Sequence, residues 1–330
     1  MGLSSAEPKA IIVTSETRLE QLKSRFNNIA QAKFFIKQSK KIAKSSNISQ
    51  NQVLEDADVD FDRYEVEDVN YRNSLEQTIK NLRGIIKTKV VQRAYITNYL
   101  FDPKDIVIVI GRDGLVANTA KYAAGNPIIG VNPDSHQYDG ILLPFNPSNL
   151  VPIVKKVIRG NYRYKMVTMA EAKLNDGQRL LAFNDLFIGP KTHVSARYRL
   201  SFHGQSENHS SSGIIVSTGA GSTGWLSSLF NMAKGIGNAF LGRSEVNQIT
   251  LEWDTNELIF IVREPFSSKT TQVTLAAGRL SAKSPLIIES QMPENGIIFS
   301  DGIQSDYLQF NSGSIATIGI AKEKAKLVLG

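Results

Sequence analysis

The chain has 330 residues, of which 42% are hydrophobic and 21% are charged, proportions that are ordinary for a folded globular protein of about two domains. No stretch approaches the about 20 apolar residues of a membrane span, and the opening MGLSSAEPKA lacks the basic and apolar parts of a secretion signal, so we expect a cytoplasmic protein with no membrane partner. The absence of cysteine excludes disulfides, thiolate nucleophiles and cysteine metal sites.

The net charge and the histidines bear on which ligands the chain can bind. A formal charge of +7 suits an anionic partner, which could be a nucleotide, a nucleic acid or a lipid head group. Because no basic motif is interleaved with aromatic residues, we expect no nucleic acid partner. The four histidines lack HxxxH or HExxH spacing and indicate ordinary surface or core positions: His136, His193, His203 and His209.

Strands and helices alternate in the first part of the chain. Residues 10–13 (AIIV) predict a strand, and Thr17 and Glu20 have the spacing of a capping box that opens a helix. An apolar stripe at helical spacing follows, formed by Leu19, Leu22, Phe26 and Ile29. We expect this helix to continue into a basic, solvated face that carries Lys33, Lys37, Lys40, Lys41 and Lys44.

Residues 45–68 predict an acidic loop or insertion, because they are polar and then acidic and lack regular periodicity. A helical stripe returns over residues 71–82. Further predicted elements are strands at 89–93, 105–110 (DIVIVI) and 127–131 (PIIGV), and a helix at 116–123. This alternation predicts a right-handed parallel α/β domain over residues 1–150.

The pattern changes after a helix predicted at residues 149–159. Alternating or β-rich runs occupy residues 162–169, 179–183, 195–202, 213–217, 257–262, 285–289, 296–299 and 316–320. We therefore expect a largely antiparallel, β-rich domain over residues 151–330, whose C-terminal segment can return to the first domain.

A first candidate site is the turn formed by Gly111, Arg112, Asp113 and Gly114, directly after the DIVIVI strand. Open α/β sheets bind ligands at the carboxyl ends of strands, where backbone amides and helix N-termini face a crevice. Glycines let the backbone approach a phosphate closely, and the Asp113 carboxylate can accept a proton or orient a magnesium ion. The alternative is a plain Asp-Gly turn.

A second candidate is the loop of residues 217–224 (STGAGSTG), which follows a predicted strand and precedes a helix expected at 225–233. Its hydroxyls and amides could hold a phosphate, a ribose or a base edge. It lacks the lysine of a Walker A loop, and the alternative is a flexible Gly/Ser connector.

A third candidate is the pair Asn184 and Asp185, between the apolar runs LLAF and LFI. An amide beside a carboxylate can hold a ribose diol, although such pairs are also common in turns. The step from Asp301 to Gly302 predicts only a hairpin turn.

Taken in order, these motifs resemble the NAD kinase family. IVIVIGRDGLV is similar to its strand and Gly-Gly-Asp-Gly motif, NPIIGVN to its next strand, AFNDLFI to its Asn-Glu segment, and GIIVSTGAGSTGW to its second glycine-rich motif. The resemblance covers residues 105–330. It implies an N-terminal Rossmann-like α/β domain, a C-terminal β-sandwich-like domain, an active site between them, ATP with a divalent metal, and a homo-dimer or homo-tetramer.

The resemblance also implies roles for individual residues. Asp113 matches the catalytic Asp, and Gly111, Arg112 and Gly114 lie in the phosphate-facing turn. The residues that match the dinucleotide-binding positions are Asn184, Asp185, Ser217, Thr218, Gly221, Ser222 and Thr223.

Several positions depart from the family pattern. Arg112 stands where the family has a second Gly, so this position should avoid a positive φ, which is unfavourable by about 1 to 2 kcal/mol for a residue with a side chain. The other departures fall largely on acceptor-binding positions: Leu115 for Thr, Asp185 for Glu, Ser212 for Asp, Gly224-Trp225 for Ala-Tyr, and no Gly-rich stretch after Val131.

The sequence thus predicts a kinase that transfers a phosphoryl group from ATP to a hydroxyl acceptor, with NAD as the expected acceptor and a divalent metal that no dedicated protein cage holds. A lipid or sugar kinase would keep the Gly-x-Asp-Gly turn and change the acceptor pocket. A non-catalytic nucleotide sensor would keep the binding loops but would not need Asp113, so the carboxylate favours an enzyme.

Overall fold

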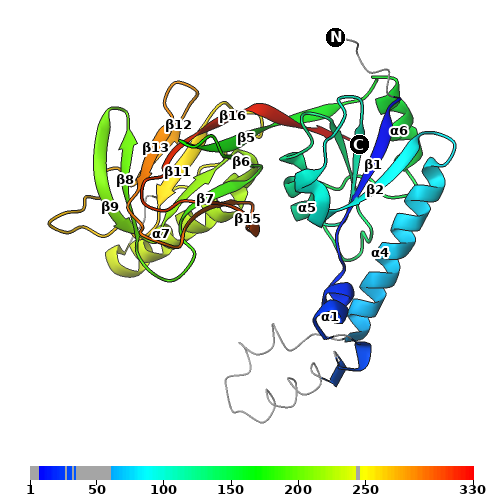
Figure 1. Ribbon diagram of the computed structural model, residues 1–330, viewed down its shortest axis with the longest axis horizontal. Coiled ribbons are helices and arrows are strands. Elements are labelled where there is room, and N and C mark those ends of the chain that lie inside the picture. Colours follow the sequence, from blue (N-terminus) through cyan, green and yellow to red (C-terminus); the bar gives the residue numbers. More distant parts are fainter. Residues whose placement is uncertain (1–6, 27, 32, 35–60, 243–245) are drawn as a thin grey trace. The chain divides into compact units, whose positions relative to one another are not determined.

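The computed structural model describes residues 7–26, 28–31, 33–34, 61–242 and 246–330. The chain divides into two compact units, coloured along the sequence in Figure 1. The first comprises Met1–Val116, Ile129–Tyr162 and Leu329–Gly330, and the second comprises Ala117–Ile128 and Arg163–Val328. The predicted boundary at residues 150 and 151 stays a prediction.

The sheet of the first unit carries the strand order β2-β1-β3-β4, with β2 at Lys87–Gln92, β1 at Lys9–Thr14, β3 at Ile106–Ile110 and β4 at Pro127–Val131. β1 pairs in parallel with both β2 and β3. All five residues of β3 are buried, which is what a continuous β-branched run between two covered faces predicts.

The capping box is confirmed at the start of α1 (Arg18–Phe26). The Thr17 backbone N–H donates to Glu20 Oε2 at 2.9 Å, and the Glu20 N–H donates to Thr17 Oγ1 at 3.2 Å. The expected continuation as one helix is interrupted, because α1 ends at Phe26 and Asn28 lies in a bend, but residues 29–31 and 33–34 are helical again. Ile29 is 39% exposed and leaves the apolar stripe. Four lysines of the basic stretch lie outside the described residues: Lys37, Lys40, Lys41 and Lys44.

α4 (Phe61–Leu82) corrects the prediction of an irregular segment through residue 68. Residues 61–68 are helical, and Phe61 and Tyr64 pack on the apolar face of α1. Glu67 and Asp68 are buried beside half-exposed arginines, so their acidity marks ion pairs on a helix rather than a solvated loop. Residues 45–60 of the predicted insertion lie outside the described residues.

The remaining helical elements of this part are the 3₁₀ helix η1 (Arg93–Asn98), α5 (Asp113–Ala120) and α6 (Leu150–Ile158). α5 begins at Asp113, earlier than predicted, and from Ala117 onward it is grouped with the second unit. α4 runs along the sheet beside β2 and α6 (Figure 1).

Two sheets enclose the core of the second unit. In one, β16 (Ile315–Val328) pairs with β13 (Leu286–Ser290) and β5 (Tyr164–Leu174), and the sheet continues through β6 (Arg179–Ala182), β8 (Ala196–Phe202) and β9 (Gln205–Ser211). The end of β16 also pairs in parallel with Pro127 and Ile128 of β4.

The other sheet has the order β12-β11-β10-β7-β14-β15 and antiparallel pairs throughout. Its strands are β7 (Asp185–Pro190), β10 (Ile214–Ser217), β11 (Leu258–Val262), β12 (Ala277–Leu280), β14 (Gly296–Ser300) and β15 (Ile303–Gln309). The 3₁₀ helix η2 (Ala220–Thr223) leads into α7 (Trp225–Leu241), whose Leu229 packs on this sheet at Phe187 and Ile215.

The predicted fold class, a parallel α/β part with a β-rich part, is confirmed. Four strands were not predicted: β7, β9, β12 and β15. β9 (QSENHSS) shows why, since its polar residues carry no hydrophobic alternation and it forms by pairing along the whole of β8. No described helix is both long and apolar enough to cross a membrane.

Candidate functional site

The Gly-x-Asp-Gly turn lies in the first unit, at the carboxyl end of β3 and the start of α5. A Cβ at Gly111 would lie 3.0 Å from Leu115 Cδ2, whereas a Cβ at Gly114 would meet nothing within 4 Å. Arg112 is not among the non-glycine residues with positive φ, as its side chain requires. The turn therefore combines one tightly packed glycine with one open glycine that leaves room for a ligand.

The side chains of the turn already have partners within the first unit. Arg112 Nη2 lies 2.7 Å from Glu67 Oε1 and 3.2 Å from Tyr138 Oη. Asp113 Oδ1 accepts a hydrogen bond of 2.9 Å from the Leu142 N–H. The charge of Arg112 is thus partly compensated by Glu67, and Asp113 is held in a fixed orientation.

A tyrosine of α4 supports this turn through two hydrogen bonds. Tyr71 Oη accepts a hydrogen bond from the Ser15 N–H and donates one to Ile110 O, each of 3.0 Å, and so bridges the ends of β1 and β3. Burial raises the pKa of the Tyr71 phenol, which keeps it a donor. The sequence indicated a helix here but did not show that its tyrosine reaches both strands.

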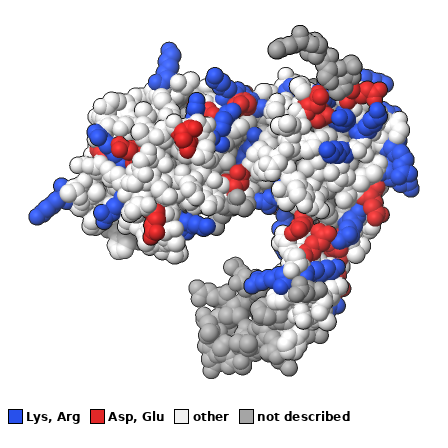
Figure 2. Space-filling view, viewed as in Figure 1, with Lys and Arg blue, Asp and Glu red and all other residues white. Residues whose placement is uncertain are grey.

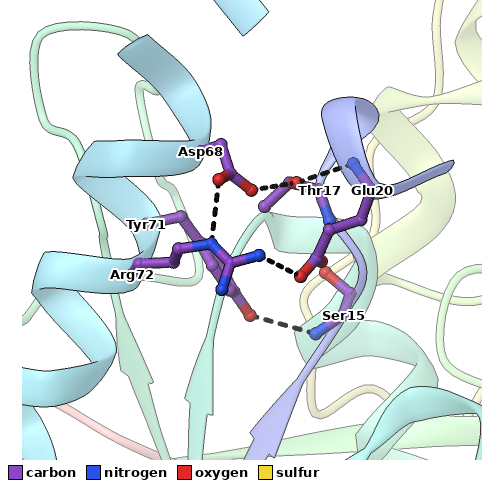
Figure 3. Close-up of polar contacts among 6 residues, drawn as sticks. All are labelled: Ser15, Thr17, Glu20, Asp68, Tyr71 and Arg72. Carbon is purple, nitrogen blue, oxygen red and sulfur yellow. Dashed lines mark hydrogen bonds and ion pairs between the residues drawn. The ribbon is translucent and has the colours of Figure 1, made fainter. Parts of the chain in front are cut away.

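An ionic network lies beside this tyrosine (Figure 3). Asp68 accepts hydrogen bonds from Thr17 Oγ1 at 2.6 Å and Arg72 Nε at 2.8 Å, and Arg72 Nη2 lies 2.7 Å from Glu20 Oε1. The capping box of α1 is therefore tied to α4 through charged groups. The network fixes the segment that follows β1 next to the phosphate-facing turn.

The second unit brings the other predicted residues together. Ser217 pairs with Asp185 in the β10 and β7 register. The Thr218 N–H donates to Asn184 O at 2.9 Å, and Thr218 Oγ1 donates to Phe183 O at 2.6 Å. The Asn-Asp pair and the Ser/Thr/Gly loop thus form one contiguous site.

The hydroxyls of the loop serve mainly to fold it. Ser217, Thr218 and Ser222 are fully buried, and Ser222 Oγ donates to Gly219 O at 2.7 Å. Thr223 is exposed at the end of η2. Ligand contacts by Ser217, Thr218, Gly221, Ser222 and Thr223 stay predictions.

Gly221 sets the distance between the loop and the Asn-Asp pair. A Cβ at this position would lie 2.2 Å from Asn184 O and 2.8 Å from Asp185 Oδ1. Real Cβ atoms essentially never come this close to another heavy atom. The absence of a side chain therefore lets the two segments touch.

Asp185 is a buried carboxyl with a perturbed charge state. Its Oδ1 is enclosed and has no hydrogen-bond partner among the described residues. Burial raises the pKa of Asp185 to about 7, Ser217 acts in the opposite direction, and the Asp301 carboxylate acts in the same direction as burial. A carboxyl that titrates near neutral pH beside a binding loop is typical of functional sites.

The sequence did not predict that two further residues, Asp301 and Lys121, belong to this site. Asp301, interpreted only as a hairpin turn, has a 2% exposed side chain that accepts bonds from the Asn184 and Phe183 N–H groups. Lys121, with a side chain 1% exposed, lies 3.9 Å from Asp301 Oδ2. The signal for Lys121 was its position as a lone charge among small and apolar residues in VANTAKYAAG.

A cavity of about 1090 Å³ in the second unit lies elsewhere. Its lining includes Trp225, Arg263 and His209 but none of the predicted site residues. We base the candidate site on the side-chain chemistry of the Asn-Asp pair and its loop, because volume alone does not indicate a reaction.

Comparisons with known proteins bear on this arrangement. The chain is 32% identical to a Chlorobium phaeobacteroides NAD kinase over 37% of this chain and 43% of that protein. It is 25% identical to human NAD kinase 2, mitochondrial, over 321 residues, which cover 77% of this chain and 71% of that protein. Among solved structures, yeast NADH kinase complexed with NADH matches with a TM-score of 0.58 and 12% identity, over 99% of this chain and 84% of that one.

The chain is thus similar to NAD kinases in sequence and in fold, at low identity. An NAD kinase from Archaeoglobus fulgidus, in complex with ATP, has the same fold, with a TM-score of 0.53 and 18% identity over 78% of this chain and 89% of that one. No family model matches the sequence. The NAD kinase-like chain spans less than half the length of the first bacterial relatives it matches, 43% and 44%.

Tyr71→Phe tests the support of the turn in this NAD kinase-like protein. The change leaves the Ser15 N–H and Ile110 O without their partner, so the free energy of unfolding should fall by about 1 to 3 kcal/mol. Tyr95→Phe is the control, because Tyr95 is 65% exposed. Equal stability of the two variants in chemical denaturation would contradict the bridging role of Tyr71.

Gly221→Ala tests the close approach of the loop to Asn184. The added Cβ must displace the loop, so nucleotide affinity should fall at least about tenfold, and stability by about 1 to 3 kcal/mol. Gly235→Ala is the matched control, because a Cβ there meets nothing within 4 Å. It should leave affinity unchanged and stabilise α7 slightly. Calorimetric titration and thermal unfolding measure both effects.

Asp185→Asn tests the charge state of the buried carboxyl. The pKa of Asp185 is about 7 in the folded chain, against about 4 in an unfolded one. Its preference for the neutral form therefore stabilises the protein fully below about pH 4, and this contribution is lost as pH rises through about 7. The variant stays neutral and should be more stable than wild type at pH 8 by about 1 to 4 kcal/mol, with little difference at pH 4 to 5. Asp254→Asn, at an exposed carboxylate, should show no such pH dependence.

Proposed function

We propose that this chain transfers the γ-phosphoryl group of ATP to a hydroxyl of NAD, forming NADP. The observation that carries the proposal is the contiguous site of Asn184, Asp185 and the loop of residues 217–224, enclosed around a carboxyl that titrates near pH 7. Names of the relatives, NAD kinase and NADH kinase, support the same reaction class.

Each part of the site has a role in this proposal. The Asn184 amide and the Asp185 carboxylate hold a ribose diol of the acceptor, by donating to one oxygen and accepting from the other. The backbone N–H groups of the loop of residues 217–224 donate hydrogen bonds to the acceptor. In the phosphate-facing turn, the backbone around Gly111 and Gly114 approaches the donor phosphates, and Arg112 adds positive charge to the extent that Glu67 leaves it uncompensated.

The chemical step is an in-line attack of the acceptor hydroxyl on the γ-phosphorus. Asp113 takes the proton of the attacking hydroxyl, so that the new P–O bond forms as the bond to the ADP oxygen breaks. The Leu142 N–H, 2.9 Å from Asp113 Oδ1, holds the carboxylate in a single orientation. A fixed base lowers the entropic barrier of proton transfer.

A divalent metal would come with the donor. No group of three or more His, Asp or Glu side chains among the described residues is arranged to hold an ion. Mg²⁺ commonly keeps several waters and is bound by phosphates with one or two carboxylates, so Asp113 fits as its protein contact. When bound, the ion neutralises charge on the phosphate oxygens.

On the one face that Figure 2 shows, the charges of the described residues favour a small anionic ligand over a nucleic acid. On the face shown in Figure 2, the Lys and Arg side chains of the described residues are dispersed and interspersed with Asp and Glu. Nucleic-acid sites usually gather basic groups in one patch or stripe. We further propose a homo-dimer or homo-tetramer, as the resemblance to NAD kinases implies. Its partners are nucleotides, its location is the cytoplasm, and it has no membrane or nucleic acid partner, as the sequence patterns predict.

Asp113→Asn tests the proposed function. ATP consumption is measured with NAD, NADH, diacylglycerol, sphingosine and sugars, and NAD should give the fastest turnover. The variant should lose a factor of about 10² to 10⁴ in turnover with little change in the affinity for NAD, because Asp113 acts in the chemical step and not in holding the acceptor. Asp139→Asn, at an exposed position, is the matched control.

The outcomes separate the alternatives. Fastest turnover with a lipid or a sugar would replace NAD as the acceptor. Nucleotide binding without turnover by the wild type would indicate a sensor. Unchanged turnover of Asp113→Asn would reduce Asp113 to a turn residue.

A further inference from the structure

A buried ionic cluster lies directly behind the Asn-Asp pair of the second unit. Lys121, the residue after α5, donates from Nζ to Ser300 Oγ at 2.7 Å and lies 3.9 Å from Asp301 Oδ2 and 3.5 Å from Asp306 Oδ2. Asp306 is also hydrogen-bonded to the Tyr122 hydroxyl. Lys121 and Asp301 are almost completely enclosed, so neither charge is screened by water.

The Asp301 carboxylate holds the backbone of the Asn-Asp pair. Its Oδ1 accepts from the N–H groups of Asn184 at 2.6 Å and Asp185 at 3.3 Å, and its Oδ2 accepts from Phe183 N–H at 3.1 Å. In return the Asp301 N–H donates to Asp185 O at 2.9 Å. Asp301 adopts a positive φ of 54°, a strained conformation that this set of bonds maintains.

The same carboxylate acts electrostatically on Asp185. Burial raises the pKa of Asp301, while Lys121 and the three N–H donors act in the opposite direction. Three N–H donors and the Lys121 ammonium favour the carboxylate form of Asp301, and this carboxylate in turn disfavours the ionisation of Asp185. The loop of residues 217–224 contributes no ionisable group. Among the described residues, the charged group that acts on Asp185 is Asp301, and Lys121 and Asp306 follow behind it.

We propose that Asp301 and Lys121 are positioning residues that together set the charge of Asp185 and thereby the pH range in which a ribose-bearing nucleotide binds beside it. Asp301 keeps Asp185 in place and disfavours its ionisation, and Lys121 limits that effect by neutralising Asp301. This inference rests on the proposed function, since it assigns Asp185 the task of accepting a ribose hydroxyl.

The two residues act in opposite directions, which gives the inference its test. An ionised Asp185 accepts a hydrogen bond from the ribose, so the affinity for NAD should rise as pH increases through about 7. Removal of the negative charge in Asp301→Asn makes Asp185 easier to ionise and should move the midpoint to lower pH. Removal of the positive charge in Lys121→Met should move it to higher pH.

The experiment is calorimetric titration of the full chain with NAD between pH 5.5 and pH 9. We expect each variant to shift the midpoint by about half a pH unit or more, in opposite directions, because one buried charge at this range is worth at least that. Lys121→Arg keeps the charge and should restore the wild-type midpoint. A merely structural role would lower affinity at every pH without moving the midpoint.

A second measurement covers variants that bind poorly or fold poorly. The pH dependence of the free energy of unfolding needs no ligand, and Asp301→Asn should move its inflection to lower pH, an effect that disappears in an Asp185→Asn background. If wild type binds no NAD at any pH, the proposed function fails. If NAD binds but neither the binding midpoint nor the unfolding inflection moves in Asp301→Asn, the inference is wrong while the proposed function stands.

Discussion

The acceptor part of the candidate site depends on one carboxylate, that of Asp301. It accepts hydrogen bonds, which water would otherwise accept, from three consecutive backbone N–H groups. These bonds fix the chain at the start of β7, where Asn184 and Asp185 lie. Because a buried carboxylate is stable only when it is bonded and neutralised, Lys121 is required beside it. The loop of residues 217–224 then packs against a preset edge, at a distance that only a glycine at position 221 permits.

A similar arrangement occurs in the first unit. Arg112 departs from the glycine pattern of the NAD kinase-like family, and α4 supplies the acidic partner, Glu67, at 2.7 Å. The substitution therefore does not simply add a free positive charge to the phosphate-facing turn. Part of that charge is compensated within the protein, and the guanidinium lies over the ring of Tyr138, 5.0 Å from its centroid. The departure at position 112 is therefore physically linked to an acidic residue of α4.

The sequence predicted what depends on local pattern. The buried run of β3, the capping box at Thr17 and the glycine-rich turns follow from neighbouring residues, and the structure contains them. It could not predict features that depend on distant partners. The acidic first part of α4 is helical where Glu67 and Asp68 form ion pairs with arginines. The polar strand β9 forms by antiparallel pairing with β8. Asp301 has the sequence of a hairpin turn, and only the fold shows that its side chain points inward.

The enclosed hydroxyls of the glycine-rich loop have a consequence for kinetics. Thr218 Oγ1 donates to Phe183 O and accepts from the Gly221 N–H, and Ser222 Oγ donates to Gly219 O. These hydrogen bonds fold the loop without any contribution from a ligand. In the proposed function, a nucleotide would bind here at little cost in the conformational entropy of the protein, since no segment of the loop has to order around it. Its association rate is then governed by diffusion and orientation rather than by a slow closing step.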